Sequence, residues 1–144
     1  MVSDFSVLKR SIEGDFLDSS FDLGRYATDA SIYQLMPKVV VVPKTVNDAR
    51  EVIYFAQKNG FSVLARGGGT SQNGQTVNNS IVIDNSKYLN KILEFDPISR
   101  KCVVEPGIVL DELNRFLKPH GLFFPVDVST SSRATIGGMA GNNS

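Results

Sequence analysis

The sequence predicts an α+β fold whose first lobe is α/β-like, and three local patterns support this assignment. A run of four valines at 39–42, an apolar stripe with helical spacing over 46–56 and an apolar run at 62–65 predict a βαβ unit with parallel strands. Two apolar runs at 91–95 and 101–105 flank the turn-rich segment DPISR and predict an antiparallel hairpin. We expect the unit and the hairpin to form one lobe, followed by the start of a second, truncated lobe.

Residues 1–36 are expected to form an N-terminal helix and a lead-in segment, ahead of a domain at 37–144. Apolar residues recur at near-helical spacing from Phe5 to Phe16, although Gly14 weakens such a helix by about 1 kcal/mol relative to alanine. The polar stretch that follows predicts a segment lying over the domain.

The helix of the βαβ unit has recognisable ends in the sequence. Thr45 can serve as its N-cap, with Asp48 three residues later as the partner in a capping box. Asn59 and Gly60 predict its end, because glycine readily adopts the left-handed conformation of a C-cap. A third strand is expected at 81–83.

A second helix is predicted at 110–117, because its charges fit the helix dipole. Asp111 lies in its first turn, Arg115 lies toward its end, and Gly121 follows it as a stop signal. The segment VEPG at 104–107 is interpreted as a structural turn, in which proline fixes the chain direction and glycine relieves crowding.

The composition excludes several classes of protein. Fifteen basic and fifteen acidic residues leave a formal net charge of +0, whereas nucleic-acid-binding proteins usually have a basic excess. No apolar run approaches the ~20 residues of a membrane span. Cys102 is the only cysteine and His120 the only histidine, so we expect no internal disulfide and no histidine-based metal site. A cytoplasmic location is the default.

The segment LARGGGTSQNGQ at 64–75 places three consecutive glycines directly after an apolar run. Without side chains, successive backbone N–H groups become accessible to an anion, and α/β sheets bind ligands at the ends of parallel strands. The segment differs from a P-loop because Gln75 stands where lysine is needed, and from the dinucleotide fingerprint because Gln72 replaces the third glycine. A phosphate-binding loop is therefore predicted, and a loop that only turns the chain is the alternative.

Three segments, in order, resemble the FAD-binding domain of the vanillyl-alcohol oxidase / p-cresol methylhydroxylase flavoprotein superfamily. They are PKTVNDAREVIYFAQKNGFSVLARGGGTSQNG, IVIDNSKYLNKILEFDPISRKCVVEPGIVLDELNRFLKPHGLFFPVD and ATIGGMAGNNS. Within that superfamily the chain most resembles FAD-linked 2-hydroxyacid dehydrogenases that act on D-lactate or glycolate. GRYATDASIYQ resembles the lead-in of large members with iron–sulfur clusters, which implies a cluster only in sequence beyond residue 144.

The resemblance implies that backbone amides of the glycine-rich loop hold the FAD pyrophosphate. The residues concerned are Arg66, Gly67, Gly68, Gly69, Thr70 and Ser71. Arg66 either adds positive charge or faces solvent, and side chains at the glycines would stand where phosphate oxygens must sit. Many members attach the flavin covalently through a histidine at the place of Thr70, so non-covalent FAD is implied here.

A second contact region is implied between residues 125 and 143. Pro125 and Asp127 should lie by the isoalloxazine or ribityl part, whereas Gly137 and Gly138 should let the backbone approach the cofactor. The full set is Pro125, Asp127, Ser129, Thr130, Ser132, Ala134, Thr135, Gly137, Gly138 and Asn142.

The function implied by the resemblance is oxidation of a small 2-hydroxy acid of the D-lactate or glycolate type to the 2-keto acid, with the electron acceptor left open. Two alternatives remain: a same-fold flavoenzyme of the UDP-N-acetylenolpyruvoylglucosamine reductase or alcohol oxidase type, and a non-enzymatic nucleotide-binding or electron-transfer module. We expect the chain to be an inactive fragment of a longer cytoplasmic protein, with peripheral attachment to the inner membrane as an option. No catalytic residue is named.

Overall fold

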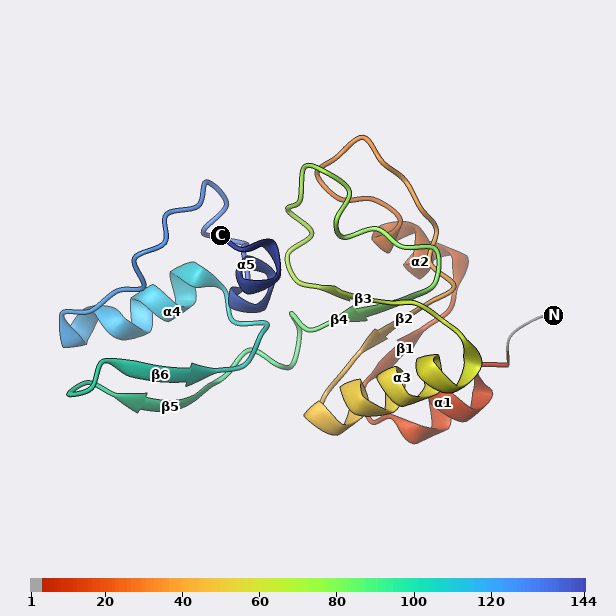
Figure 1. Ribbon diagram of the computed structural model, residues 1–144, viewed down its shortest axis with the longest axis horizontal. Helices are drawn as coiled ribbons and strands as arrows, with labels where there is room; N and C mark the ends of the chain where they lie inside the picture. The colour runs from red at the N-terminus through yellow and green to blue at the C-terminus, as the bar shows by residue number, and fades with distance from the viewer. Residues whose placement is uncertain (1–3) are drawn as a thin grey trace.

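The computed structural model describes residues 4–144, which form two lobes side by side (Figure 1). The first lobe, residues 4–84, contains a four-stranded sheet, and the second, residues 92–144, contains a two-stranded hairpin. The helices are α1 (Ser6–Ser11), α2 (Ser20–Tyr26), α3 (Val46–Asn59), α4 (Leu110–Leu117), the 3-10 turn η1 (Lys118–His120) and α5 (Ile136–Asn142). The strands are β1 (Asp15–Leu17), β2 (Val39–Val42), β3 (Val63–Arg66), β4 (Ile81–Asp84), β5 (Ile92–Asp96) and β6 (Lys101–Val104). The predicted α+β class is confirmed, but the hairpin lies in the second lobe and not, as expected, in one lobe with the βαβ unit.

The sheet of the first lobe has the strand order β1-β2-β4-β3. Strand β2, helix α3 and strand β3 form the predicted βαβ unit, but β4 lies between β2 and β3 and pairs in parallel with both. β1 adds an antiparallel edge next to β2. Because β3 and β4 end at the paired residues Arg66 and Asp84, the loops that follow them leave the same edge of the sheet.

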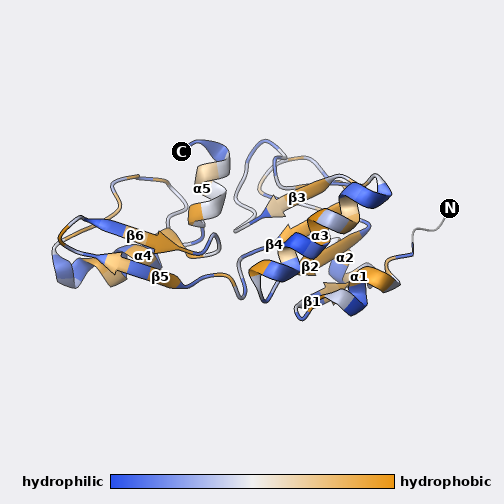
Figure 2. Ribbon diagram, turned by 60° about the horizontal axis from the view of Figure 1, so that its bottom comes forward, coloured by the Kyte–Doolittle hydropathy of each residue, from blue (hydrophilic) through white to orange (hydrophobic). Residues whose placement is uncertain are grey.

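The four-valine strand is apolar throughout because both of its faces are covered. Val39 and Val41 pack with Leu8 of α1 and Val52 of α3, whereas Val40 faces the opposite side. There it packs with Tyr26 of α2 and with β4, so α2 and the two other helices cover opposite faces (Figure 1). Figure 2 shows β2 and β3 as largely hydrophobic, while α3 alternates between hydrophobic and hydrophilic residues. A sheet buried on both faces favours such continuous apolar runs.

The N-terminal helix ends earlier than the apolar spacing indicates. It stops at Ser11, and Phe16 lies in β1, from which it packs against the core. Ile12 is already extended, and at Gly14 the chain approaches β2 so closely that a Cβ would collide with the carbonyl oxygen of Val42. The chain therefore runs as the edge strand β1 beside β2. It then forms α2, which covers the face of the sheet opposite to α1 and α3.

Asp48 joins three segments of the first lobe. The predicted capping box is present, since Thr45 and Asp48 exchange side-chain and backbone hydrogen bonds, and Gly60 ends α3 in the left-handed conformation. The Asp48 carboxylate also accepts the backbone N–H groups of Glu13 at 3.0 Å, Gly14 at 3.1 Å and Lys44 at 2.8 Å. Burial opposes its ionisation, but these donors outweigh burial and hold the pKa of Asp48 below its usual range.

The second lobe is built on the predicted hairpin, whose inner face packs on α4. Cys102 lies half-buried in this core, and burial raises the pKa of its thiol. His120 lies at the end of η1 with its ring 4.7 Å from that of Phe95, as expected of a helix-end residue. Gly107 confirms the structural interpretation of VEPG, because a Cβ there would collide with the carbonyl oxygen of Asn85.

Helix α5 is the main element that the sequence analysis missed. The sequence analysis gives Gly137 and Gly138 only a role in placing backbone beside a ligand, and glycine has low helix propensity. Tertiary contacts outweigh that propensity: Thr135 caps the helix through Gly138 N–H, and Met139 is buried against Leu110. Within residues 4–144, no helix is long and apolar enough to cross a membrane.

We predict that Asp48→Asn lowers the free energy of unfolding by about 3 kcal/mol at pH 7, because the new amide N–H₂ group faces backbone donors. The folded-state pKa of Asp48 is depressed, so its contribution is present above the unfolded pKa of about 3.9 and is lost as pH falls through the folded value. Urea unfolding should show the difference at pH 7 and a smaller one near pH 3. Glu51→Gln, on the same helix, is the control, and an equal loss there would contradict this role.

Candidate functional site

The glycine loop, defined here as residues 67–76, leaves the end of β3 as a compact turn. Gly69 and Gly74 have positive φ angles of 64° and 74°, a conformation that favours glycine. The Ser71 hydroxyl accepts the backbone N–H groups of Asn73 at 3.2 Å and Gln75 at 3.3 Å, and it also contacts the Gln75 side chain. The second half of the loop is therefore fixed by its own hydrogen bonds.

The first half of the glycine loop has no such internal pairing. Within the described residues, the backbone N–H groups of residues 67–71 donate no hydrogen bond to any other protein group. Five consecutive backbone donors are therefore available to a ligand. Such a series at the carboxyl ends of parallel strands is suited to bind an anion with several oxygen atoms.

Two of the three consecutive glycines allow the glycine loop to touch the second lobe. A Cβ on Gly67 would collide with the hydroxyl of Thr135, and a Cβ on Gly68 would collide with the carbonyl oxygen of Arg133. The sequence analysis attributes the missing side chains to phosphate oxygens, whereas in the structure the loop at 133–135 occupies the space. The two predicted contact regions thus lie against each other.

The second loop, defined as residues 125–135, is attached to the start of α4. The amides of Leu110 and Asp111 donate to the carbonyl oxygens of Ala134 at 3.0 Å and Ser131 at 3.2 Å. Thr135 forms a β-bridge with Val109, and its hydroxyl accepts Gly138 N–H at 3.2 Å. Within the second loop, the amides of Ser131, Arg133 and Ala134 donate to the carbonyl oxygens of Val128 and Thr130, so these groups serve the fold, while the side chains of Ser129 and Ser132 are exposed.

Arg66 has neither of the two roles considered for its side chain. Its guanidinium neither faces solvent freely nor lies open to a ligand, because it donates to the carbonyl oxygens of Tyr26 at 3.2 Å, Thr28 at 2.9 Å and Thr76 at 3.0 Å. Its guanidinium also lies 5.2 Å from the centre of the Tyr26 ring. Burial lowers the pKa of Arg66, although arginine stays protonated at neutral pH.

Arg133 is a candidate that the sequence analysis did not single out. Its carbonyl oxygen touches the glycine loop at Gly68, and its side chain is exposed. It is also the only lysine or arginine in residues 119–144, which is the signal that could have identified it. The guanidinium of Arg66 is engaged elsewhere, whereas Arg133 is an exposed cation at the junction of the two loops.

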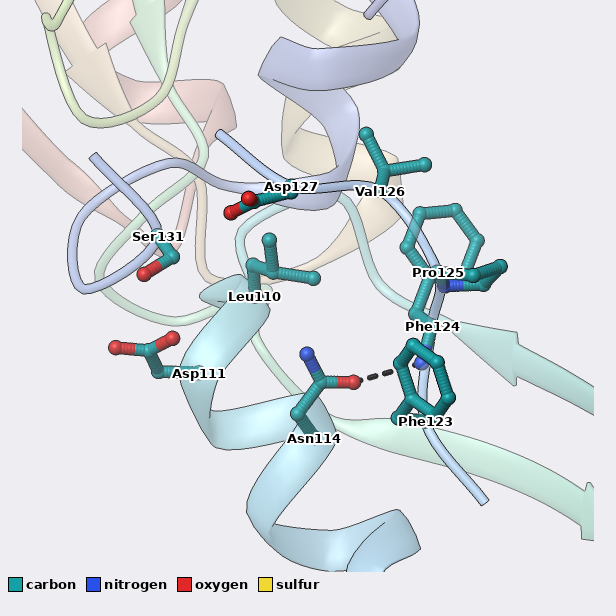
Figure 3. A pocket seen from close by; sticks show the side chains of 9 residues that line it. All are labelled: Leu110, Asp111, Asn114, Phe123, Phe124, Pro125, Val126, Asp127 and Ser131. Carbon is teal, nitrogen blue, oxygen red and sulfur yellow. Dashed lines mark hydrogen bonds between the residues drawn. The ribbon is translucent and has the colours of Figure 1, made fainter. Parts of the chain in front are cut away.

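A pocket of about 380 Å³ lies between α4 and the second loop (Figure 3). Asn114 accepts the backbone N–H of Phe124 at 2.7 Å and so fixes the aromatic wall. The lining consists of Leu110, Asp111, Asn114, Phe123, Phe124, Pro125, Val126, Asp127 and Ser131. Two carboxylates and no basic residue line it, so this pocket disfavours a phosphate group, while its aromatic and apolar wall suits a flat ring.

The remaining predicted site residues divide by location. Ser129 and Thr130 lie in the turn of the second loop, where Arg133 and Ala134 N–H donate to the carbonyl oxygen of Thr130, and Ser132 is exposed beside them. Ala134 is buried against Leu110 and Met139.

The two α5 glycines and Asn142 also differ in their surroundings. A Cβ on Gly137 would lie 2.6 Å from the Cβ of Pro106, which gives Gly137 a packing role. Gly138 is exposed, and Asn142 accepts a hydrogen bond from Gln75 at 3.1 Å, a second link between the lobes. No group of three histidine, cysteine, aspartate or glutamate residues in the described part of the chain could hold a metal ion.

Comparison with known proteins gives three findings. A family described as FAD binding domain matches residues 37–144. D-2-hydroxyglutarate dehydrogenase of Haemophilus influenzae is 45% identical over 130 residues, which are 88% of this chain and 13% of that protein. Glycolate oxidase subunit GlcD of Bacillus subtilis is 31% identical over 133 residues, 90% of this chain and 28% of that protein. The chain therefore spans only a small part of these relatives.

A solved structure of alkyldihydroxyacetonephosphate synthase has the same fold. It superposes with a TM-score of 0.80 at 20% identity, over 93% of this chain and 30% of that one.

We predict that Gly67→Ala and Gly68→Ala each lower the free energy of unfolding by roughly 1–3 kcal/mol, the usual effect of forcing a methyl group into occupied space. Gly141→Ala is the matched control: it lies in α5 with open space around its Cβ, so the change should stabilise by roughly 0.5–1 kcal/mol. Chemical denaturation measures all three variants. Equal stability of the Gly67 and Gly141 variants would show that the loops do not touch at Gly67.

Proposed function

The chain belongs to the FAD binding domain family, and on this premise we propose that its glycine loop binds the diphosphate of FAD. The observation that supports this most directly is the series of unpaired backbone N–H groups at residues 67–71 in the described structure. Hydrogen bonds from such donors to a charged oxygen contribute roughly 1.5–3 kcal/mol each. The arrangement fits a diphosphate without needing the lysine of a P-loop.

We propose that the positive charge that pairs with the diphosphate is that of Arg133 and not that of Arg66. An arginine pairs well with phosphate because its planar N–H groups match two oxygens at once. Arg133 is exposed at the junction of the loops, whereas Arg66 already donates to three carbonyl oxygens. The hydroxyls of Thr70 and Ser132 lie on the same two loops and can add donors.

The pocket beside α4 supports a direction for the bound molecule. The second loop passes from this pocket, at Asp127 and Ser131, to the glycine loop, at Arg133 and Thr135. FAD carries a ring system at each end, and the aromatic lining suits the isoalloxazine ring, which the resemblance places near Pro125 and Asp127, while the diphosphate stays at the loops. Nothing in the described loops provides a histidine for covalent attachment, which supports non-covalent FAD.

For the whole protein we propose oxidation of a D-2-hydroxy acid to the 2-keto acid, with D-2-hydroxyglutarate as the first substrate to test. This rests on the names of the relatives, among which D-2-hydroxyglutarate dehydrogenase of Haemophilus influenzae has the higher identity and GlcD the lower. When bound, FAD supplies the acceptor for two electrons from the hydroxyl-bearing carbon. The described residues hold the cofactor, and we assign no catalytic base among them.

The single cysteine supports a cytoplasmic location.

We predict that the chain binds FAD more tightly than riboflavin, which lacks phosphate, and that Arg133→Ala removes part of this difference. The variant should bind FAD roughly tenfold more weakly, as expected for one charge-assisted contact, with riboflavin affinity unchanged. Flavin fluorescence titration measures the affinities of the unmodified chain and of Arg133→Ala for FAD and for riboflavin. Arg50→Ala, an exposed arginine on α3, is the control. Equal affinity for FAD and riboflavin would contradict a diphosphate site.

The activity is tested on the full-length natural protein through its visible absorption spectrum. We predict flavin bands that bleach on addition of D-2-hydroxyglutarate, and more slowly with D-lactate or glycolate. Bleaching by NADPH alone would instead support the reductase alternative. Bound FAD with no bleaching by any hydroxy acid would support a non-enzymatic module.

A further inference from the structure

Residues 26–34, called the lead-in segment from here on, lie outside the region that matches the family. They nevertheless contact the glycine loop directly. The segment is folded back on itself by a β-bridge between Thr28 and Gln34 and by a hydrogen bond of 2.9 Å from Leu35 N–H to the carbonyl oxygen of Ala27. Ala27 is fully buried. Figure 1 shows this orange segment beside the yellow-green glycine loop, above the sheet. It is therefore an ordered neighbour of the proposed diphosphate site.

Arg66 connects the lead-in segment to both ends of the glycine loop. It precedes the loop in sequence, and its guanidinium donates to Tyr26 and Thr28 in the segment and to Thr76 at the loop's far end. Gly69 lies against the same guanidinium, since a Cβ there would be 2.6 Å from its Nη2 atom. The loop is thus closed around an arginine that is itself held by the segment.

Asp29 and Tyr33 hold the far half of the loop from the segment side. The Asp29 carboxylate accepts the Thr76 hydroxyl at 3.0 Å and its N–H at 3.4 Å. Burial opposes ionisation of Asp29, but the donors from Ser31 and Thr76 outweigh it, so its pKa lies below the usual range and it is charged at neutral pH. The Tyr33 ring lies against Gly74, where a Cβ would be 2.6 Å from its Cδ2 atom.

We propose that residues 26–34 and Arg66 are positioning residues that hold the glycine loop in the conformation that binds the diphosphate. This inference rests on the proposed binding of FAD. In it, Asp29, Tyr33 and Arg66 do not touch the cofactor but hold the loop that carries the unpaired N–H groups of residues 67–71 in one conformation. Ordering the loop before binding removes part of the entropy cost that the ligand would otherwise bear.

The sign of the effect at Asp29 separates this role from simple electrostatics. Removing a negative charge near a diphosphate site should strengthen FAD binding if only charge matters. If Asp29 positions the loop, Asp29→Asn should weaken FAD binding, by roughly tenfold for one charged hydrogen-bonding group. Tyr33→Ala should weaken it in the same direction without any change of charge.

The experiment combines FAD titration with ¹⁵N relaxation of the FAD-free chain. Order parameters of residues 67–76 should fall from about 0.85 to below about 0.6 in both variants, with the β2 and β4 amides unchanged. Asp18→Asn is the control, because Asp18 lies in the same N-terminal region and pairs only with Lys9 in the described structure. That variant should match the unmodified chain in both measurements.

The outcomes separate this inference from the proposed function. Equal or tighter FAD binding by Asp29→Asn would overturn the positioning role while FAD binding itself stands. Absence of FAD binding by the unmodified chain would overturn the proposed function, and the order parameters would then decide the positioning role. Unchanged order parameters of residues 67–76 in both Asp29→Asn and Tyr33→Ala would overturn the positioning role.

Discussion

The close contact between the glycine loop and the second lobe is the constraint on which the site depends. Gly67 and Gly68 touch the loop at Arg133 and Thr135 so closely that neither position has room for a Cβ. This contact brings a loop of the parallel sheet beside a loop of the hairpin lobe, from segments more than sixty residues apart in the chain. Without it, the unpaired amides, the exposed arginine and the aromatic pocket would not lie along one surface.

Charge divides that surface into regions with different chemistry. The junction of the loops carries backbone donors and Arg133, whereas the pocket beside α4 carries Asp111 and Asp127. An anionic group is therefore favoured at the junction of the loops and disfavoured in the pocket. Arg66 shows that position in the sequence alone does not assign a role. It ends β3 next to the glycines, but its guanidinium donates hydrogen bonds to the carbonyl oxygens of Tyr26, Thr28 and Thr76.

The first lobe could be predicted in detail because its signals are local. The four valines, the capping box of Thr45 and Asp48, and the C-cap at Gly60 all lie where the sequence places them. The insertion of β4 between β2 and β3 could not be predicted, since strand order depends on non-local pairing. Helix α5 was missed for a related reason: glycines argue against a helix, and only the burial of Met139 and the cap by Thr135 overcome this.

The sequence singles out two loops that the structure places against each other, but it does not give the reason for their glycines. The role of Arg66 depends on the fold of the lead-in segment, which carries no regular pattern, and Arg133 could be found only by counting cations. Gly137 packs on Pro106, whereas its neighbour Gly138 is exposed. This difference, too, could be found only from the three-dimensional structure.

A ¹H–¹⁵N NMR titration of the chain with FAD tests the central claim most directly. The account predicts that the largest shifts occur at the amides of residues 67–71, with further shifts at 132–135 and around the pocket beside α4. Shifts confined to α3, α1 or the outer face of the hairpin, with the amides of residues 67–71 unmoved, would contradict it.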